Sequence, residues 1–204
     1  MKYFNTLPKI LTSDSKGNNI ILTNLLARAS VIPSILKDIS LYYEYDVQEG
    51  ETPEIVSYKY YGTTEDFWVV LFSNQILDPQ WNWPLSGKNF DDYIISKYGS
   101  ISNATSAVGY YEEIITTTVS NSSEPPEVKT YVIDETTYNN PTPPDKTFSL
   151  PSGFTVTVSS TKRIVSVYEK ELNLNESKRK IKLLNKKYVN TIEQELITLM
   201  ETGQ

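Results

Sequence analysis

The hydrophobic pattern first becomes regular in a stretch that predicts a strand followed by a helix. Large apolar residues alternate with acidic ones over 43–47, which is the period of a half-buried strand. Gly50 permits a sharp turn, Thr52 is a favourable N-cap, and Pro53 suits the first helical position. The pattern therefore predicts a helix that begins at Pro53 and ends at Gly62.

A second predicted helix follows directly. It opens at Thr63 or Thr64, with Asp66 placed to reach back in the manner of a capping box. Asn74 tolerates the left-handed conformation and predicts the end of this helix, and Asp78, which precedes a proline, predicts a turn. The helix is apolar nearly all round, which is unusual on the surface of a monomer and favours an interface.

The N-terminal segment predicts an apolar arm and a helix. Residues 3–11 form the arm, and residues 20–32 have apolar side chains at helical spacing until Pro33 limits the helix. The spaced residues are Leu22, Leu25, Leu26 and Ala29. Two interpretations of the arm are open: it folds back on the module that follows, or it lies on another subunit.

The composition changes at Ser100. Just before it, residues 86–98 predict a helix that ends at Gly99. Beyond it, small polar residues and proline dominate, and six of the eleven prolines fall within 125–151. This composition disfavours helix and predicts a small antiparallel sheet, with the prolines in its connections. Its strands are expected at Tyr111–Val119, Val128–Ile133 and Phe154–Val158.

The end of the chain predicts a hairpin and a final helix. Residues 163–172 and 178–184 have strand-like patterns on either side of a polar turn. Asn185 is then expected to cap a helix whose apolar stripe comprises Tyr188, Ile192, Leu196 and Leu199. The stripe packs either on the hairpin or on a neighbouring subunit, because helices of this length depend on tertiary contact.

Together these elements predict an α+β protein. It would combine a strand–helix–helix unit with a small antiparallel β unit and a C-terminal helix. The expected segments are 1–41 for the arm and its helix, 42–99 for the strand–helix–helix domain with a trailing helix, 100–184 for the β-rich domain, and 185–204 for the C-terminal helix. A chain of 204 residues can bury two small cores.

Composition excludes several classes of chemistry and partner. The chain has neither cysteine nor histidine, which excludes disulfides, thiol nucleophiles, the usual zinc sites and histidine-dependent triads. The net charge is −6, and residues 1–161 alone carry −9, so nucleic acid is not an expected partner. Residues 162–204 hold 9 basic and 6 acidic side chains, which form a solvated face or meet an acidic neighbour. No signal peptide or membrane span is expected.

Three pairs of adjacent carboxylates do not amount to a glycosidase site. They are Asp91–Asp92, Glu112–Glu113 and Asp134–Glu135. Neighbouring side chains point in different directions, whereas glycoside hydrolysis needs two carboxyl groups that face each other across a sugar. We therefore expect no enzymatic activity, no catalytic residues, no metal site and no cofactor.

The strand–helix–helix stretch resembles the LysM module. The matching residues are Tyr45, Val47, Gly50, Glu51, Thr52, Val56, Tyr61, Gly62, Trp68, Leu71, Asn74 and Pro79. The stretch departs from the module at Pro53, in its apolar second helix, and at 81–85, which replaces the closing strand. The resemblance implies a shallow groove for N-acetylglucosamine polymers between two loops. The candidate groove residues are Gly50, Thr52, Asn74 and Asp78.

Further motifs are similar to a narrower family, the LysM-containing baseplate wedge proteins of T-even-type contractile-tailed bacteriophages. They are TPE (52–54), YYG (60–62), DFWVVLFSN (66–74), DPQWNWPLS (78–86), KYG (97–99) and NESKRKIKLL (175–184), whereas 100–161 matches no motif. The resemblance implies a structural subunit of the virion's tail baseplate, assembled in the host cytoplasm. Its implied partners are other wedge proteins, hub proteins, and neighbouring copies of itself or its wedge, so that wedges are joined around the central hub.

Aromatic residues supply the candidate contact surface. They make up 12% of the chain, more than so small a module can bury, and tyrosine and tryptophan dominate interface energetics. The candidate contact residues are Phe67, Trp68, Phe72, Trp81 and Trp83. A different class of function is also open, a peptidoglycan-binding adaptor that uses the sugar groove, because fold alone does not determine function.

Overall fold

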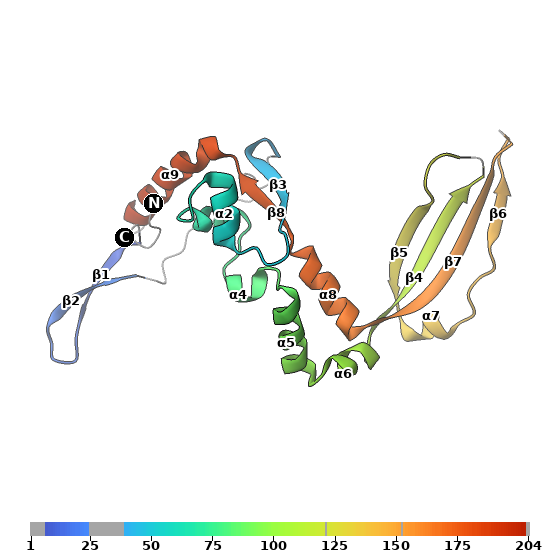
Figure 1. The fold of residues 1–204 in the computed structure, drawn as a ribbon, viewed down its shortest axis with the longest axis horizontal. Helices are drawn as coiled ribbons and strands as arrows, with labels where there is room; N and C mark the ends of the chain where they lie inside the picture. Colours follow the sequence, from blue (N-terminus) through green and yellow to red (C-terminus); the bar gives the residue numbers. More distant parts are fainter. Residues whose placement is uncertain (1–6, 25–38, 121, 152, 203–204) are drawn as a thin grey trace. The chain divides into compact units, whose positions relative to one another are not determined.

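The computed structural model describes residues 7–24, 39–120, 122–151 and 153–202. It confirms an α+β fold built from helices and antiparallel sheets (Figure 1). The chain divides into two compact units, of which unit 1 comprises residues 1–86 and 176–204 and unit 2 comprises residues 87–175. Unit 2 is therefore inserted into the sequence of unit 1.

Unit 1 is closed by a strand from the end of the chain. Its elements are β1 (Lys9–Ser13), β2 (Asn19–Thr23), the 3₁₀ helix η2 (Ile39–Leu41), β3 (Tyr42–Asp46), α2 (Pro53–Tyr61), α3 (Phe67–Ser73), α4 (Pro79–Asn82), β8 (Lys180–Leu184), the 3₁₀ helix η3 (Lys186–Tyr188) and α9 (Val189–Thr202). β3 pairs antiparallel with β8. Residues 81–85 form no strand, and the partner of β3 comes from residues 180–184.

The expected signals fix both ends of α2. The Thr52 hydroxyl accepts a hydrogen bond from the Ile55 N–H at 3.4 Å, and Pro53 is the first helical residue. Gly62 ends the helix with φ of 87°, in the left-handed region that glycine occupies without strain. The sequence prediction for this helix is confirmed.

The start of α3 differs from its prediction, while its end agrees. The Thr63 hydroxyl accepts from the Glu65 N–H at 3.1 Å, which forms a local turn instead of a helix cap. The helix therefore begins at Phe67 and not at Thr63 or Thr64, and it ends before Asn74 as expected.

Two apolar clusters form the core of unit 1. The first contains Leu7, Tyr42, Trp68, Val69, Leu184, Val189, Leu196 and Met200. The second contains Val47, Val56, Val70, Trp83, Ile181 and Leu183. Each cluster combines side chains from the N-terminal and C-terminal portions of the sequence, so unit 1 cannot complete its core before β8 is in place.

The C-terminal helix packs on this core, but not entirely through the predicted stripe. Asn185 caps η3 and not the longer helix, because its side chain accepts from the Lys187 N–H at 3.2 Å. Leu196 is buried as expected, whereas Leu199 is 56% exposed and Met200 takes the buried position with 6% exposed. The last turn of the helix is therefore rotated relative to the stripe that was inferred.

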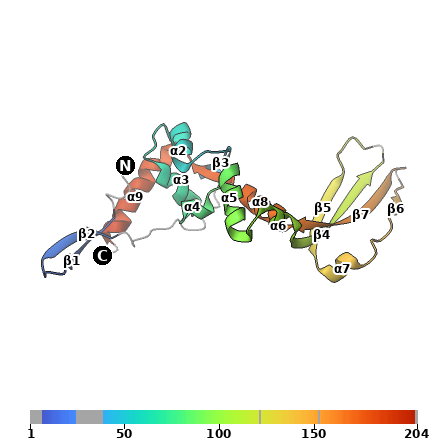
Figure 2. The same ribbon diagram turned by 60° about the horizontal axis from the view of Figure 1, so that its bottom comes forward.

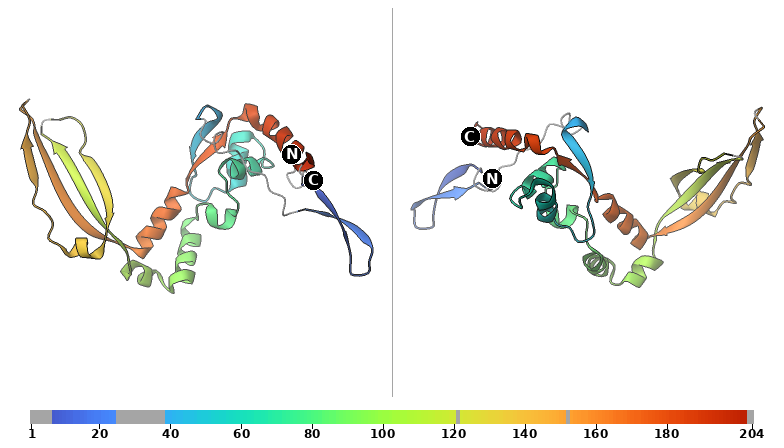
Figure 3. Two further views of the ribbon diagram at one scale, coloured as in Figure 1. Left: turned by 180° about the vertical axis from the view of Figure 1, so that it is seen from behind. Right: turned by 45° about the horizontal axis from the view of Figure 1, so that its top comes forward.

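The N-terminal segment forms a hairpin where a helix was expected. β1 and β2 pair antiparallel and form the blue hairpin of Figure 3. Ile10 lies opposite Leu22 in their register. The carboxylate of Asp14 accepts from the Lys16 and Asn18 N–H groups, both at 2.8 Å, and holds the turn. The helix prediction is wrong for residues 20–23, and the rest of it, with Leu25, Leu26 and Ala29, lies outside the described residues.

Unit 2 is built around a four-stranded antiparallel sheet in the order β5-β4-β7-β6 (Figure 2). Its elements are α5 (Gly87–Tyr98), α6 (Ile101–Ser106), β4 (Val108–Val119), β5 (Glu127–Ile133), α7 (Glu135–Asn139), β6 (Lys146–Ser149), β7 (Thr155–Ser166) and α8 (Val167–Ser177), whose last residues pass into unit 1. The expected sheet is confirmed, and Pro125, Pro126, Pro143 and Pro144 lie outside its strands as predicted.

Short helices flank this sheet although helix was disfavoured after Ser100. The Ser100 hydroxyl accepts from the Asn103 N–H at 3.0 Å to cap α6, and Asp134 accepts from the Thr137 N–H at 2.8 Å to cap α7. The trailing helix before them, α5, was predicted correctly, and Gly99 follows it with φ of 83°.

The hairpin predicted near the C-terminus is wrong. Its first half divides between the end of β7 and the helix α8, and its second half is β8, which pairs with β3. The Ser166 hydroxyl accepts from the Glu169 N–H at 3.1 Å, a cap that starts α8. Glu171 on this helix then accepts from Lys97 Nζ at 2.9 Å and from Tyr98 Oη at 2.6 Å, which ties α8 to α5.

Candidate protein-contact surface

Trp81 and Trp83 have opposite environments although they lie two residues apart. The Asp78 carboxylate accepts from the Gln80 N–H at 3.1 Å and caps α4, which carries Trp81. Trp81 is 51% exposed, whereas Trp83 is only 7% exposed. The indole Nε1 of Trp83 donates to the Glu51 carbonyl at 2.7 Å within the second cluster. Trp81 is therefore a surface residue and Trp83 a core residue.

The apolar character of α3 is explained by burial within unit 1. Trp68 and Val69 pack in the first cluster, while Val70 packs in the second. Phe72 is partly buried against Trp68, with their ring centroids 6.2 Å apart, and Phe67 is also partly buried. Trp68 and Trp83, both expected on the contact surface, instead belong to the core.

Exposed apolar side chains nevertheless remain on unit 1. They include Tyr43 on β3, Ile55 and Tyr58 on α2, and Leu77 and Trp81 around α4. Of these, Trp81 has the largest side chain, and it lies in the short, capped helix α4. It is the member of the predicted set that the structure leaves most accessible.

The four candidate sugar-groove residues have roles in the local fold. Gly50 has φ of 77°, and Thr52 and Asp78 cap α2 and α4. The Asn74 side chain donates to the carbonyl of Lys182 and accepts from its N–H, both at 2.8 Å. The Asn74 amide thus makes the two hydrogen bonds that the backbone of a neighbouring strand would make to Lys182, and it covers the outer edge of β8.

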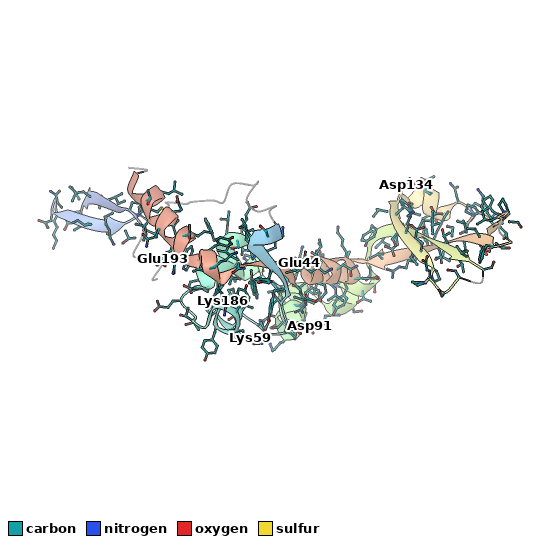
Figure 4. All side chains as sticks on the ribbon, turned by 90° about the horizontal axis from the view of Figure 1, so that it is seen from above. Glu44, Lys59, Asp91, Asp134, Lys186 and Glu193 are labelled. Carbon is teal, nitrogen blue, oxygen red and sulfur yellow. The ribbon has the colours of Figure 1, made fainter. Side chains whose placement is uncertain are left out.

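A buried carboxylate that sequence reasoning missed lies beside this surface. Glu51 accepts from Tyr45 Oη at 2.9 Å, from the Gln48 N–H at 2.8 Å, and from the ammonium of Lys59, which Figure 4 labels. Burial opposes ionisation, but the hydrogen bonds from Lys59, Gln48 and Tyr45 outweigh it and lower the pKa of Glu51. The only signal in the sequence was its place in the matched motif between Gly50 and Thr52.

The basic charges of β8 are compensated within unit 1. Lys182 lies opposite Glu44, and Lys180 lies opposite Asp46, across the β3–β8 pair. Arg179, which directly precedes β8, forms salt bridges with Glu49 at 2.5 Å and with Glu176 at 2.7 Å. Part of the basic C-terminal charge is thus turned toward acidic residues of the same chain.

The described residues offer neither a metal site nor a membrane-spanning helix. No group of three or more acidic side chains there is placed to hold a metal ion. Within the same ranges, no helix combines the length and the hydropathy that a membrane crossing requires.

The fold and surface define an α+β protein that presents an accessible indole from a firmly capped turn, an arrangement suited to protein–protein contact. Comparison with family models matches residues 32–199 to the family described as base plate wedge protein 53. The chain belongs to this family. It is thus a structural protein of the phage tail baseplate. A search of curated proteins found no match.

Proposed function

We propose that this protein joins neighbouring baseplate wedges around the central hub through protein–protein contacts, with no enzymatic role. Its partners would be other wedge proteins, hub proteins and neighbouring copies of itself. The family supports the baseplate setting, and the exposed indole of Trp81 is the observation that carries the joining role.

The position of Trp81 supports this role because contacts within the chain hold the backbone at this residue. Asp78 caps the turn that carries it, and Lys178 Nζ donates to its carbonyl at 2.8 Å. The backbone around Trp81 is therefore fixed by residues from both sequence segments of unit 1. A fixed backbone lowers the entropy that is lost when Trp81 binds a partner, which favours this residue as an interface hot spot.

We also propose that unit 1 is LysM-like and that the particle has a T-even-type contractile tail. In support, β3, α2 and α3 follow the expected order and β8 supplies the closing strand. A sugar-binding adaptor is not favoured, because Thr52, Asn74 and Asp78 are engaged in helix caps and in the edge of β8.

Replacement of Trp81 by alanine tests the joining role. Loss of an interfacial tryptophan costs on the order of 2 kcal/mol, roughly a thirtyfold loss of affinity at each contact. We expect the Trp81→Ala protein to melt like the parent but to fail in complementing a phage that lacks the gene. Tyr58→Ala, which removes another exposed aromatic side chain of unit 1, is the control and should complement.

Two results would contradict the proposal. Normal assembly of the Trp81→Ala protein would show that Trp81 is not needed to join wedges, and the joining role would lose its supporting observation. Saturable micromolar binding of N-acetylglucosamine oligomers in calorimetry, abolished by Thr52→Ala or Asn74→Ala, would favour the adaptor instead.

A further inference from the structure

The two edges of the β3–β8 sheet are protected differently. On β8, Asn74 bonds both outward backbone groups of Lys182, and Tyr61 Oη donates to the Leu184 carbonyl at 2.9 Å. The side chains of Tyr61 at the end of α2 and of Asn74, which directly follows α3, thus cover this edge. Natural proteins commonly block an edge strand in such ways because an open edge can pair with another chain.

The outer edge of β3 is open at Glu44, which Figure 4 labels, while the next outward carbonyl, that of Asp46, accepts from Gln48 Nε2 at 2.7 Å. The Val47 N–H donates to the Arg179 carbonyl at 2.9 Å, and the Asn185 N–H donates to the Leu41 carbonyl at 2.8 Å. Because bonded pairs alternate along an antiparallel ladder, the N–H and C=O of Glu44 point away from β8. In the described part of the chain, neither group has a hydrogen-bond partner.

The hairpin β1–β2 presents a complementary open edge. The Asn24 N–H donates to the Pro8 carbonyl at 2.8 Å, so the same alternation points the backbone groups of Leu11 away from β2. Its apolar side chains are also accessible, with Leu11 69% and Ile21 71% exposed. A two-stranded hairpin is marginally stable alone in water, so this one needs further contacts.

We propose that the β1 strand of one copy adds antiparallel to the open edge of β3 in a second copy. Leu11 then lies opposite Glu44, and the two residues exchange both of their backbone hydrogen bonds. In this register Lys9 lies opposite Asp46 and Thr12 lies opposite Tyr43. The opposite charges of Lys9 and Asp46 favour β1 over β2, whose residue at the same place would be Asn19.

The position of Leu7 favours a second copy over the same chain. Leu7 is buried in the first cluster with Tyr42, at the far end of β3 from Asp46. Two extended residues reach at most about 7 Å, whereas the four steps from Tyr42 to Asp46 span roughly 13 Å. Leu7 packs in the first cluster, whereas Val47, the neighbour of Asp46, packs in the second, which favours the Lys9 of a second copy as the partner of Asp46.

This contact rests on the proposed joining role and describes its geometry between copies. The edge of β1 meets the edge of β3, so the two surfaces in contact are different. Such a head-to-tail contact repeats from copy to copy and closes into a ring when the rotation permits.

Disulfide trapping tests the register. Because the chain has no cysteine of its own, any disulfide must join the introduced cysteines. Thr12→Cys and Tyr43→Cys are made in separate full-length proteins, because these positions would form a close, non-hydrogen-bonded pair. Mixing the two under mild oxidation should give a disulfide-linked heterodimer. The matched control pairs Leu22→Cys with Tyr43→Cys, which would link only if β2 occupied the edge. Thermal melts first establish that each variant is folded.

Each outcome decides between the alternatives. A heterodimer from Thr12→Cys with Tyr43→Cys alone, weakened by Lys9→Glu and restored by adding Asp46→Lys, supports the proposal. Linkage of the Leu22→Cys control overturns the assignment to β1. A doubly substituted chain that closes internally as a monomer overturns the second copy, and no linkage in any mixture overturns the contact itself. Because trapping uses purified protein, its failure is distinct from a failure of the Trp81 complementation test.

Discussion

Trp83 gives the most direct test of how unit 1 is held together. Its ring lies in the second cluster, and its indole N–H satisfies the buried carbonyl of Glu51. Trp83→Ala should cost about 3–5 kcal/mol for the lost packing and the cavity. Trp83→Phe keeps most of the ring and leaves the Glu51 carbonyl unpaired, which costs about 1–3 kcal/mol.

The three tryptophans provide an assay that is selective for unit 1. Trp68, Trp81 and Trp83 all belong to this unit, so tryptophan fluorescence reports its unfolding, while far-UV circular dichroism reports both units. In urea titrations the midpoint of the fluorescence transition should fall most for Trp83→Ala and less for Trp83→Phe. Trp81→Ala, the exposed counterpart, should leave it nearly unchanged. An unaltered slope would show that the native state alone was weakened.

The order of the urea midpoints of these three variants tests whether Trp83 belongs to the core and Trp81 to the surface. If Trp83→Ala unfolded at the parental urea concentration, Trp83 could not belong to the core. If Trp83→Phe matched the parent while Trp83→Ala was strongly destabilised, the packing would stand and the hydrogen bond to Glu51 would contribute nothing measurable. A large effect of Trp81→Ala on the same transition would show that this residue supports the fold.

Two further predictions concern the same unit. Asn74→Ala removes the side chain that covers β8 and should cost about 1–3 kcal/mol, measured by urea unfolding, with faster hydrogen exchange at the Lys182 amide; unchanged exchange would contradict the edge-capping role. Because the pKa of Glu51 is lowered in the folded state, its contribution is present above the ordinary value of 4.5 and is lost as pH falls through the lower folded value. Stability should therefore decline below about pH 5, less steeply for Glu51→Gln, and parallel profiles of the two proteins would refute this assignment.

Local signals predicted the elements whose ends depend on neighbouring residues. Thr52 and Gly62 bound α2 as expected because a cap is a contact between residues three or four positions apart. The strands of the unit 2 sheet were found for a similar reason, since β-branched runs and prolines define them locally. These features do not depend on which distant segment lies alongside.

The errors arose where a distant partner decides the structure. The pattern of 178–184 correctly predicts a strand but favours pairing with the neighbouring segment, while its true partner, β3, lies more than a hundred residues earlier. The sequence favours a surface position for Trp83 and Trp68 because the apolar residues of β8 and α9 that cover them lie far along the chain. The pattern recorded that these side chains are apolar, and only the pairing of β3 with β8 shows what buries them.

The insertion of unit 2 imposes a condition on when unit 1 can act. Glu51, Trp83 and the strand β3 come early in the chain, but Ile181 and Leu183, which complete their cluster, come after unit 2 has been made. Until then the apolar face of α2 and α3 lacks its cover, and Lys178 cannot fix the carbonyl of Trp81. The bond from Lys178 to the Trp81 carbonyl therefore forms only after unit 2 has been made, together with the cover that Ile181 and Leu183 give to the second cluster.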